Sequence, residues 1–425
     1  MAQTNSRDRD LRERAARVIP GGMYGHQSVG LLPDDYPQFF ERGDGAHIWD
    51  VDGRRYLDFM CAYGPNLFGY GQPEIDAAYV RQLGLGDTMT GPTALMVELA
   101  EALTGMVTHA DWAIFCKNGT DATTMALTTA RAHTRRKTVV RAKGAYHGAA
   151  PWCVPRPSGT IDSDRAHQIL CDYNDVASLE AAVAQAGDDL AAIFAAPFKH
   201  DAFIDQADPD PAYARRAREL CDRTGALLVV DDVRAGFRLV RDCSWSRLGV
   251  QPDLSTWGKC LANGHPLSVM LGSDVARKAA ASIYVTGSFW YQAATMAAAL
   301  ETLRLIRETD YLERITALGE RLRAGLDERS KAAGFGFRQT GPGVMPLFLF
   351  DDDPDLRKGF CFSSEMLSRG VYVHPWHNMF LCAAMTEADI DGALDAAEGA
   401  FGVLKRQVRD LAPVEKLAFL SAGAR

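Results

Sequence analysis

The fold is decided by the stretch Leu227-Leu228-Val229-Val230-Asp231-Asp232-Val233, an apolar run that ends in two carboxylates. Such a run predicts a strand that is buried on both faces. Similar runs occupy residues 112–115, 138–140, 190–195 and 268–271, and they alternate with helical patterns at 95–107, 121–134 and 212–224. This alternation is typical of a parallel sheet covered by helices on both faces. We therefore predict an α/β fold.

The regions on either side of this core have a different pattern. Residues 6–18 predict a charged helix, and Asp52-Gly53 predicts a hairpin between strands around 46–49 and 56–59. After a long helix predicted at 292–307, helices at 311–329 and 387–405 and strands at 345–350 and 371–374 predict a smaller α+β unit. The predicted domains are an N-terminal segment at 1–60 that is part of the small domain, a large domain at 61–310 and a C-terminal small domain at 311–425.

Composition narrows the class of protein. The chain has 425 residues, of which 47% are hydrophobic and 24% charged, and its formal net charge is -8. An acidic surface is repelled by nucleic acid and by anionic lipid, so we expect neither as a partner. The nine cysteines form no CxxC pair and the N-terminus has no apolar signal core, which favours reduced thiols and a cytoplasmic location. We predict no metal site, because the cluster at 351–353 lacks His or Cys and is typical of a solvated turn.

Two residues have the pattern of catalytic groups. Asp231 stands at the carboxyl end of a predicted strand, where open α/β sheets bind ligands. A carboxylate there can keep a heteroaromatic nitrogen protonated, although it can also simply cap the next turn. Lys259 follows 28 residues later, between Trp257-Gly258 and Cys260. A surface lysine is the ordinary alternative, but the apolar flanks favour a buried amine whose lowered pKa makes it a nucleophile and a base.

Two glycine-containing segments complete the candidate site. The segment Asn118-Gly119-Thr120-Asp121-Ala122 precedes a helix, so it predicts a phosphate cup made of free backbone N–H groups. The loop Gly144-Ala145-Tyr146-His147-Gly148 follows a strand, and Tyr146 is a candidate to stack on one face of a ring while Val233 covers the other. Taken alone, the segment at 118–122 is also typical of an ordinary helix start, and the aromatic in the loop at 144–148 is also typical of ordinary packing. Their order along the chain makes the pattern specific.

This order resembles the class III pyridoxal-phosphate aminotransferases, in the branch that contains glutamate-1-semialdehyde aminomutase. The resemblance implies a fold type I enzyme with a mostly parallel seven-stranded sheet, a smaller α+β domain built from both termini, and pyridoxal 5′-phosphate as cofactor in the large domain. It implies that Lys259 is the Schiff-base lysine, Asp231 the partner of the pyridine nitrogen, and Ser288 a phosphate contact to the other subunit of a homodimer. The cofactor-binding residues it implies are Gly119, Thr120, Asp121, Tyr146, His147, Asp231, Val233, Lys259 and Ser288.

The substrate is predicted from departures within the family pattern. Ser28 stands where the aminomutase has a carboxylate-binding arginine, and residues 370–404 contain no arginine. The chain most resembles the fumonisin-degrading members of the branch, which implies a bulky or long-chain amine as donor and pyruvate as acceptor. The candidate substrate residues are Tyr24, His26, Tyr63, Phe289, Trp290 and Arg234, with His377 as a further candidate for the acceptor carboxylate. An aminomutase and a non-catalytic cofactor-binding protein are the alternatives. A nucleotide-binding enzyme is disfavoured, because neither GxxxxGK[ST] nor GxGxxG occurs.

Overall fold

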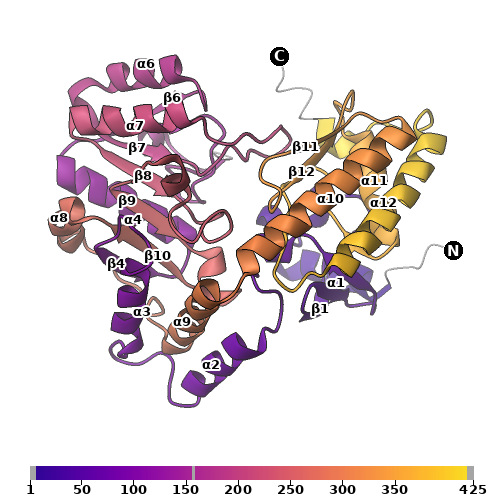
Figure 1. Cartoon of the computed structure of the whole chain (residues 1–425), viewed down its shortest axis with the longest axis horizontal. Coiled ribbons are helices and arrows are strands. Elements are labelled where there is room, and N and C mark those ends of the chain that lie inside the picture. The colour runs from indigo at the N-terminus through magenta and orange to yellow at the C-terminus, as the bar shows by residue number, and fades with distance from the viewer. Residues whose placement is uncertain (1–5, 156–157, 419–425) are drawn as a thin grey trace.

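The computed structural model describes residues 6–155 and 158–418, and its central feature is a seven-stranded sheet in the order β4-β10-β9-β8-β7-β5-β6. All neighbouring strands are parallel except that β10 runs antiparallel to β4 and β9. The predicted α/β fold with a mostly parallel sheet is confirmed (Figure 1). The strands span Trp112–Cys116 (β4), Thr138–Ala142 (β5), Gln168–Cys171 (β6), Leu190–Ala195 (β7), Leu227–Asp231 (β8), Leu254–Trp257 (β9) and Ser268–Gly272 (β10).

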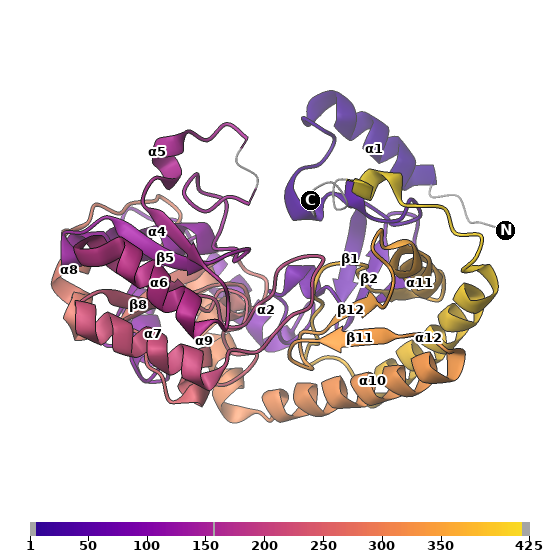
Figure 2. The same cartoon turned by 90° about the horizontal axis from the view of Figure 1, so that it is seen from above.

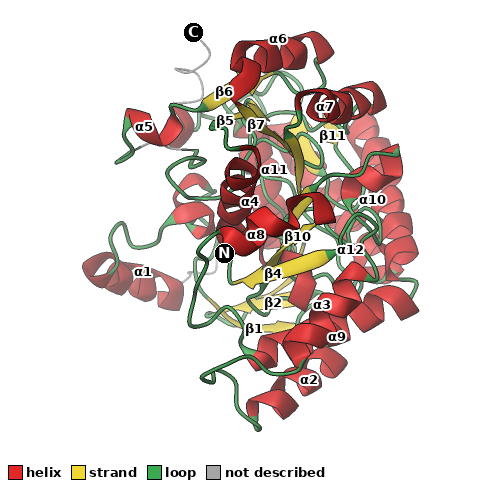
Figure 3. Cartoon of the chain, turned by 90° about the vertical axis from the view of Figure 1, so that its left-hand side faces the viewer, coloured by secondary structure: helices red, strands yellow, loops and turns green. Residues whose placement is uncertain are grey.

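Helices cover both faces of this sheet because successive strand residues point to opposite faces and are apolar on both. In β8, Leu228 and Val230 pack in the core beneath α6 and α7, whereas Val229 packs in the second core beneath α4. Figure 3 shows the yellow strands of the sheet between red helices. These helices span Gly119–Thr134 (α4), Val176–Ala186 (α6) and Pro211–Thr224 (α7). The same alternation separates Asp231 and Asp232, which follow one another at the end of β8.

A second sheet joins the two ends of the chain in the order β1-β2-β3-β13. The hairpin predicted at Asp52-Gly53 lies between antiparallel β2 and β3, and β13 pairs parallel with β3 through Val371 and Leu57. Figure 2 shows α10 extending from the large-sheet side of the molecule to the side that carries α11 and α12. The strands of this sheet span Phe40–Asp44 (β1), His47–Asp50 (β2), Arg55–Asp58 (β3) and Val371–Tyr372 (β13). A separate two-stranded sheet consists of Phe337–Thr340 (β11) and Leu347–Phe350 (β12). The helices span Tyr311–Ala333 (α10), Arg357–Ser368 (α11) and Glu387–Gln407 (α12).

The predicted helices and strands are present, and several elements were not predicted. The helix at 6–18 is α1 (Ser6–Val18), that at 95–107 is α3 (Leu95–Thr104), and that at 292–307 is α9 (Ala293–Glu308). The missed elements are α2 (Pro73–Leu83), α5 (Asp162–Arg165), α6, α8 (Arg277–Ser282), α11, β1, β6, β9 and β11. Strands such as β9 (Leu-Ser-Thr-Trp) are too short and too mixed in polarity to produce a periodic signal. Within the described part of the chain, we find no helix with the length and apolar character that a membrane span requires.

Candidate active site

The carboxyl ends of β8 and β9 bring Asp231 and Lys259 to one cavity of about 500 Å³. Asp231 is the last residue of β8 and is opposite Thr256 in the parallel strand β9, and Lys259 lies two residues beyond the end of β9. The 28 positions from Asp231 to Lys259 therefore cover one strand-to-strand crossover of the sheet. The predicted site residues that line the cavity are His26, Gly119, Thr120, Tyr146, His147, Asp231, Val233, Arg234 and Lys259.

The carboxylate of Asp231 is held by three hydrogen bonds. Its Oδ2 accepts from Nδ1 of His147 at 2.8 Å, and its Oδ1 accepts from the Thr256 hydroxyl at 2.9 Å and the Val233 amide at 3.2 Å. Because a carboxylate accepts, His147 carries its proton on Nδ1. The imidazole is buried beside Trp152, and its Nε2 has no partner among the described residues. These contacts fix the Asp231 carboxylate at the cavity wall.

Asp232 has a different environment, although it is adjacent to Asp231 and is the same type of residue. It does not line the cavity; its Oδ2 accepts from the Ser244 amide at 2.8 Å. Burial raises the pKa of Asp232 to about 6. The two side chains diverge because consecutive strand residues point to opposite faces. Asp231 alone is therefore available to a ligand.

Lys259 has the properties of an amine that reacts. Its Nζ donates a hydrogen bond to the carbonyl oxygen of Tyr63 at 2.5 Å. Burial, followed by the positive charge of Arg234, lowers the pKa of Lys259 to about 7. Its backbone is left-handed, with φ 41°, and a Cβ on the preceding Gly258 would lie 2.6 Å from Oγ of Ser268. Strain of this kind is concentrated at functional sites.

The N-terminus of α4 opens into the same cavity. Lys117, Asn118, Gly119 and Thr120 line the cavity there, and the helix contributes free N–H groups and its positive dipole end. A Cβ on Gly119 would lie 2.7 Å from Cγ1 of Val233, so only glycine fits this approach. The Thr120 hydroxyl accepts a hydrogen bond from the Ala149 amide at 3.1 Å. The arrangement has the groups that can bind an anion.

Asp121 is directed away from this anion site. Its carboxylate accepts a hydrogen bond from the Asn118 amide at 3.0 Å, which caps α4, and it does not line the cavity. On the cavity wall, Tyr146 remains 40% exposed and Val233 is partly buried, so both present a surface to a ring. Tyr146 and Val233 therefore both line the cavity, and their packing against the two faces of a planar ligand stays a prediction.

The other predicted substrate residues are dispersed. Tyr63 supplies its carbonyl to Lys259, and its hydroxyl donates to the carbonyl of His26 at 2.7 Å. The predicted residues that do not line the cavity of this chain are Tyr24, which is 71% exposed, Phe289, which is 58% exposed, Tyr63, Asp121, Ser288, Trp290 and His377. Residues that line the cavity but had no predicted role include Lys117, Thr123, His200, His265 and Ser268. His200 follows β7, so the strand-end rule that selected Asp231 also applies to it.

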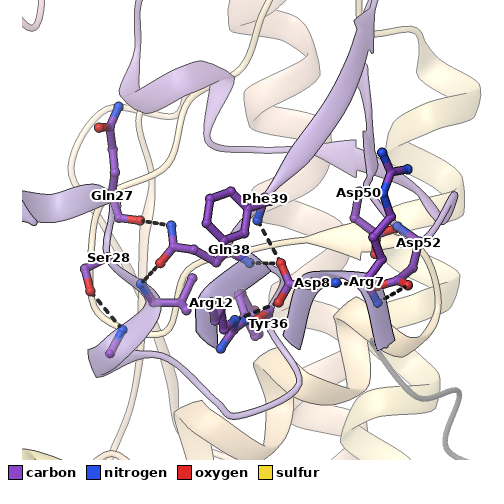
Figure 4. Close-up of polar contacts among 12 residues, drawn as sticks. Arg7, Asp8, Arg12, Gln27, Ser28, Tyr36, Gln38, Phe39, Asp50 and Asp52 are labelled. Carbon is purple, nitrogen blue, oxygen red and sulfur yellow. Dashed lines mark hydrogen bonds and ion pairs between the residues drawn. The ribbon is translucent and has the colours of Figure 1, made fainter. Parts of the chain in front are cut away.

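The segment that carries His26 and Gln27 into the cavity is held by α1 (Figure 4). The buried carboxylate of Asp8 accepts from the amides of Gln38 and Phe39, both at 2.9 Å. The Gln38 side chain accepts from the Val29 amide at 3.0 Å and donates to the Gln27 carbonyl at 2.8 Å. Through Gln38, a charge in the first turn of α1 therefore determines where one wall of the cavity lies.

Comparison with known proteins identifies the family. The family model "Aminotransferase class-III" matches residues 32–398. The chain is 59% identical over 408 residues to an aminopentol aminotransferase from Sphingopyxis macrogoltabida, covering 96% of this chain and 97% of that one. It is 32% identical to a glutamate-1-semialdehyde 2,1-aminomutase from Bordetella avium, covering 94% and 100%. The solved structure of the FumI protein of a Sphingopyxis species, in its PLP internal aldimine form, superposes with a TM-score of 0.96 at 58% identity, covering 97% and 100%. The chain belongs to the class-III aminotransferases.

Enzymes of this family use pyridoxal 5′-phosphate, and the residues of the cavity fit that cofactor. The cofactor requires an amine, an anion site and a carboxylate partner for its ring nitrogen. The cavity has a lysine whose amine is largely unprotonated above pH 7, the N-terminus of a helix, and a carboxylate fixed by three donors. Gly148, with φ 122°, could not take a Cβ, which would lie 2.6 Å from Oγ1 of Thr120. Each requirement is met by a separate wall of one cavity.

Proposed function

We propose that this aminotransferase moves an amino group from a bulky, long-chain amine, of which a fumonisin-derived amino alcohol is the model, to a keto acid such as pyruvate. The observation that carries the proposal is the identity of 59% over 96% of the chain with an enzyme that is named for aminopentol. The charges of the cavity support it. Among the described residues that line the cavity, Arg234 is the only arginine, so the site has one guanidinium for carboxylates.

In this proposal each wall of the cavity holds one part of the cofactor. Lys259 holds its aldehyde carbon, Asp231 its ring nitrogen, and Gly119 and Thr120 its phosphate, while Tyr146 and Val233 enclose the ring. When bound, the cofactor supplies an electron sink for the negative charge that develops at the amino carbon. The freed amine of Lys259, held near the Tyr63 carbonyl, takes the proton from that carbon and returns it later. Asp231 keeps a proton on the ring nitrogen by its fixed negative charge.

The donor is proposed to lack a carboxylate on its amino carbon. Ser28, the position that matches the aminomutase arginine, does not line the cavity, and its hydroxyl accepts from the Gly30 amide at 3.3 Å. A buried carboxylate without a cationic partner costs several kcal/mol. This same replacement disfavours the aminomutase activity, even though an aminomutase is among the relatives.

We also propose a homodimer with a shared active site. Ser288 is exposed and does not line the cavity of its own chain, which suits a residue that serves the neighbouring subunit. Tyr284 and Phe289 beside it are 91% and 58% exposed, and large apolar side chains at this level of exposure favour a protein interface.

The test is a spectrophotometric half-reaction on the purified holoenzyme, without acceptor. Aminopentol and 2-aminooctane are expected to convert the cofactor to its amino form much faster than L-glutamate does. Pyruvate should then restore the starting spectrum. If L-glutamate were the best donor and both alkyl amines inert, the proposed donor class would be wrong.

A further inference from the structure

Arg234 is a cation that lines the cavity and has no hydrogen bond or ion pair to a carboxylate of the described residues. It follows β8 by three residues, and within the described ranges 6–155 and 158–418 it forms no ion pair with Asp or Glu. Arg238, four residues further, is fully buried and donates to the carbonyls of Leu381 and Gly64. The guanidinium of Arg238 is therefore used in the fold, whereas that of Arg234 faces the cavity.

Two residues from the segment after β13 hold Arg234 in place. Its Nη1 donates to Oδ1 of Asn378 in a short hydrogen bond and lies 3.4 Å from Nε2 of His377. Nδ1 of His377 lies 2.6 Å from the carbonyl oxygen of Asn378, which can only accept. Nδ1 therefore carries the ring proton, and Nε2 is the acceptor that faces Arg234. Both partners use Nη1, and no described residue takes a hydrogen bond from Nε or Nη2.

Among the described residues, no carboxylate lies in ion-pair contact with this charge. Burial lowers the pKa of Arg234 to about 10, so the guanidinium stays charged at neutral pH. Burial and the charge of Arg234 lower the pKa of His200 and His377 well below the usual range, so both imidazoles are neutral there. The charges of Asp231 and Asp201 act on Arg234 without hydrogen-bond contact, and Asp231 is already bound by His147 and Thr256. A desolvated cation without a counterion is costly unless an anionic ligand completes it.

We infer that Arg234 binds the carboxylate of the keto-acid acceptor, with Asn378 and His377 as positioning residues that hold its guanidinium in a fixed orientation. The inference rests on the proposed function and assigns its second half-reaction. An α-keto acid has a carboxylate next to its carbonyl, and the free guanidinium nitrogens offer the paired donors that a carboxylate prefers. The proposed donor has no such group, so Arg234 acts on the acceptor alone.

The experiment compares pyruvate with pyruvamide, its neutral analogue, as acceptors for holoenzyme converted to the amino form. Wild-type enzyme should prefer pyruvate, and Arg234→Gln should lower kcat/KM for pyruvate about 100-fold while changing that for pyruvamide by less than about threefold. Arg234→Lys should lie between them, since a point charge replaces the planar pair of donors. Asn378→Ala should raise KM for pyruvate more than it lowers kcat. Arg321→Gln, which removes an exposed arginine of α10 that pairs with Asp391 of α12, is the matched control.

A binding measurement separates recognition from turnover. Titration calorimetry of the holoenzyme with propionate, an unreactive carboxylate, should give binding in wild type and none in Arg234→Gln. The inference is wrong if Arg234→Gln, folded and melting as wild type does, loses pyruvate and pyruvamide to the same extent, or if it still binds propionate. The amine half-reaction of wild type, measured beforehand without acceptor, tests the proposed donor class separately. If that half-reaction fails while the pyruvate preference disappears in Arg234→Gln, the proposed donor is wrong and the acceptor site is correct.

Discussion

Nδ1 of His147 donates a hydrogen bond of 2.8 Å to Oδ2 of Asp231, from a loop 84 residues earlier in the chain. This bond aligns the carboxylate together with two further donors, the Thr256 hydroxyl and the Val233 amide. Because His147 is buried and stacked beside Trp152, the orientation of Asp231 is set by packing as well as by hydrogen bonding. Such fixed charges stabilise developing charge without reorganisation.

Asp231→Asn is expected to retain the cofactor and to lose at least about 100-fold in the rate of the amine half-reaction. The amide keeps the shape of the side chain but removes the negative charge that holds a proton on the ring nitrogen. Single-turnover absorbance measurements give this rate directly. Asp232→Asn is the matched control, because Asp232 is buried against Ser244 and does not line the cavity. Equal losses in the two variants would contradict the assignment.

The pH dependence of covalent cofactor binding should report the amine of Lys259. Burial and Arg234 lower its pKa to about 7, and only the neutral amine reacts. The rate at which the apoprotein binds pyridoxal phosphate should therefore rise about tenfold per pH unit below pH 7 and become level above it. Stopped-flow absorbance between pH 5.5 and 9.5 measures this rate.

Two variants control this pH profile. Lys259→Ala should form no covalent adduct, and borohydride reduction followed by peptide mapping should place the label on Lys259 in wild type. Arg234→Gln should move the midpoint to higher pH, because its charge no longer opposes protonation of the amine. A wild-type rate that continued to rise above pH 9 would show that the amine has an ordinary pKa.

Asp8→Asn should destabilise the protein and weaken substrate binding together. The buried carboxylate accepts from the amides of Gln38 and Phe39, and loss of its charge weakens both bonds, for an expected cost of about 1–3 kcal/mol. Because Gln38 holds the segment with Gln27, the KM for the amine should rise more than kcat falls. Urea unfolding and steady-state kinetics measure the two effects. Asp10→Asn removes an exposed i,i+4 partner on the same helix and should change neither.

Subunit complementation tests the shared site. Protomers with Lys259→Ala and protomers with Ser288→Asp should each be inactive, the second because the new charge repels phosphate. After random exchange, half of the dimers are hybrids with one intact site, so about a quarter of wild-type activity should return. Native mass spectrometry confirms the exchange. No recovery among confirmed hybrids would mean that Ser288 serves its own subunit or none.

The sequence by itself determined the fold class, the family and the residues at the ends of β8 and β9. Apolar runs such as Leu227–Asp231 and the glycine before α4 are local signals, since burial on both faces and close backbone approach constrain residue type directly. Short strands of mixed polarity, including β6 and β9, produced no such signal and were found only in the structure.

Only the tertiary structure decided which of the candidate side chains share one cavity. Strand alternation assigns Asp231 to the cavity and Asp232 to the opposite side, and the cap of α4 turns Asp121 away from the anion site. Contacts with His377 and Asn378, more than 140 positions away, hold Nη1 of Arg234 and leave Nε and Nη2 without a described partner. These properties depend on which atoms desolvate one another across distant segments, and no local sequence pattern encodes that.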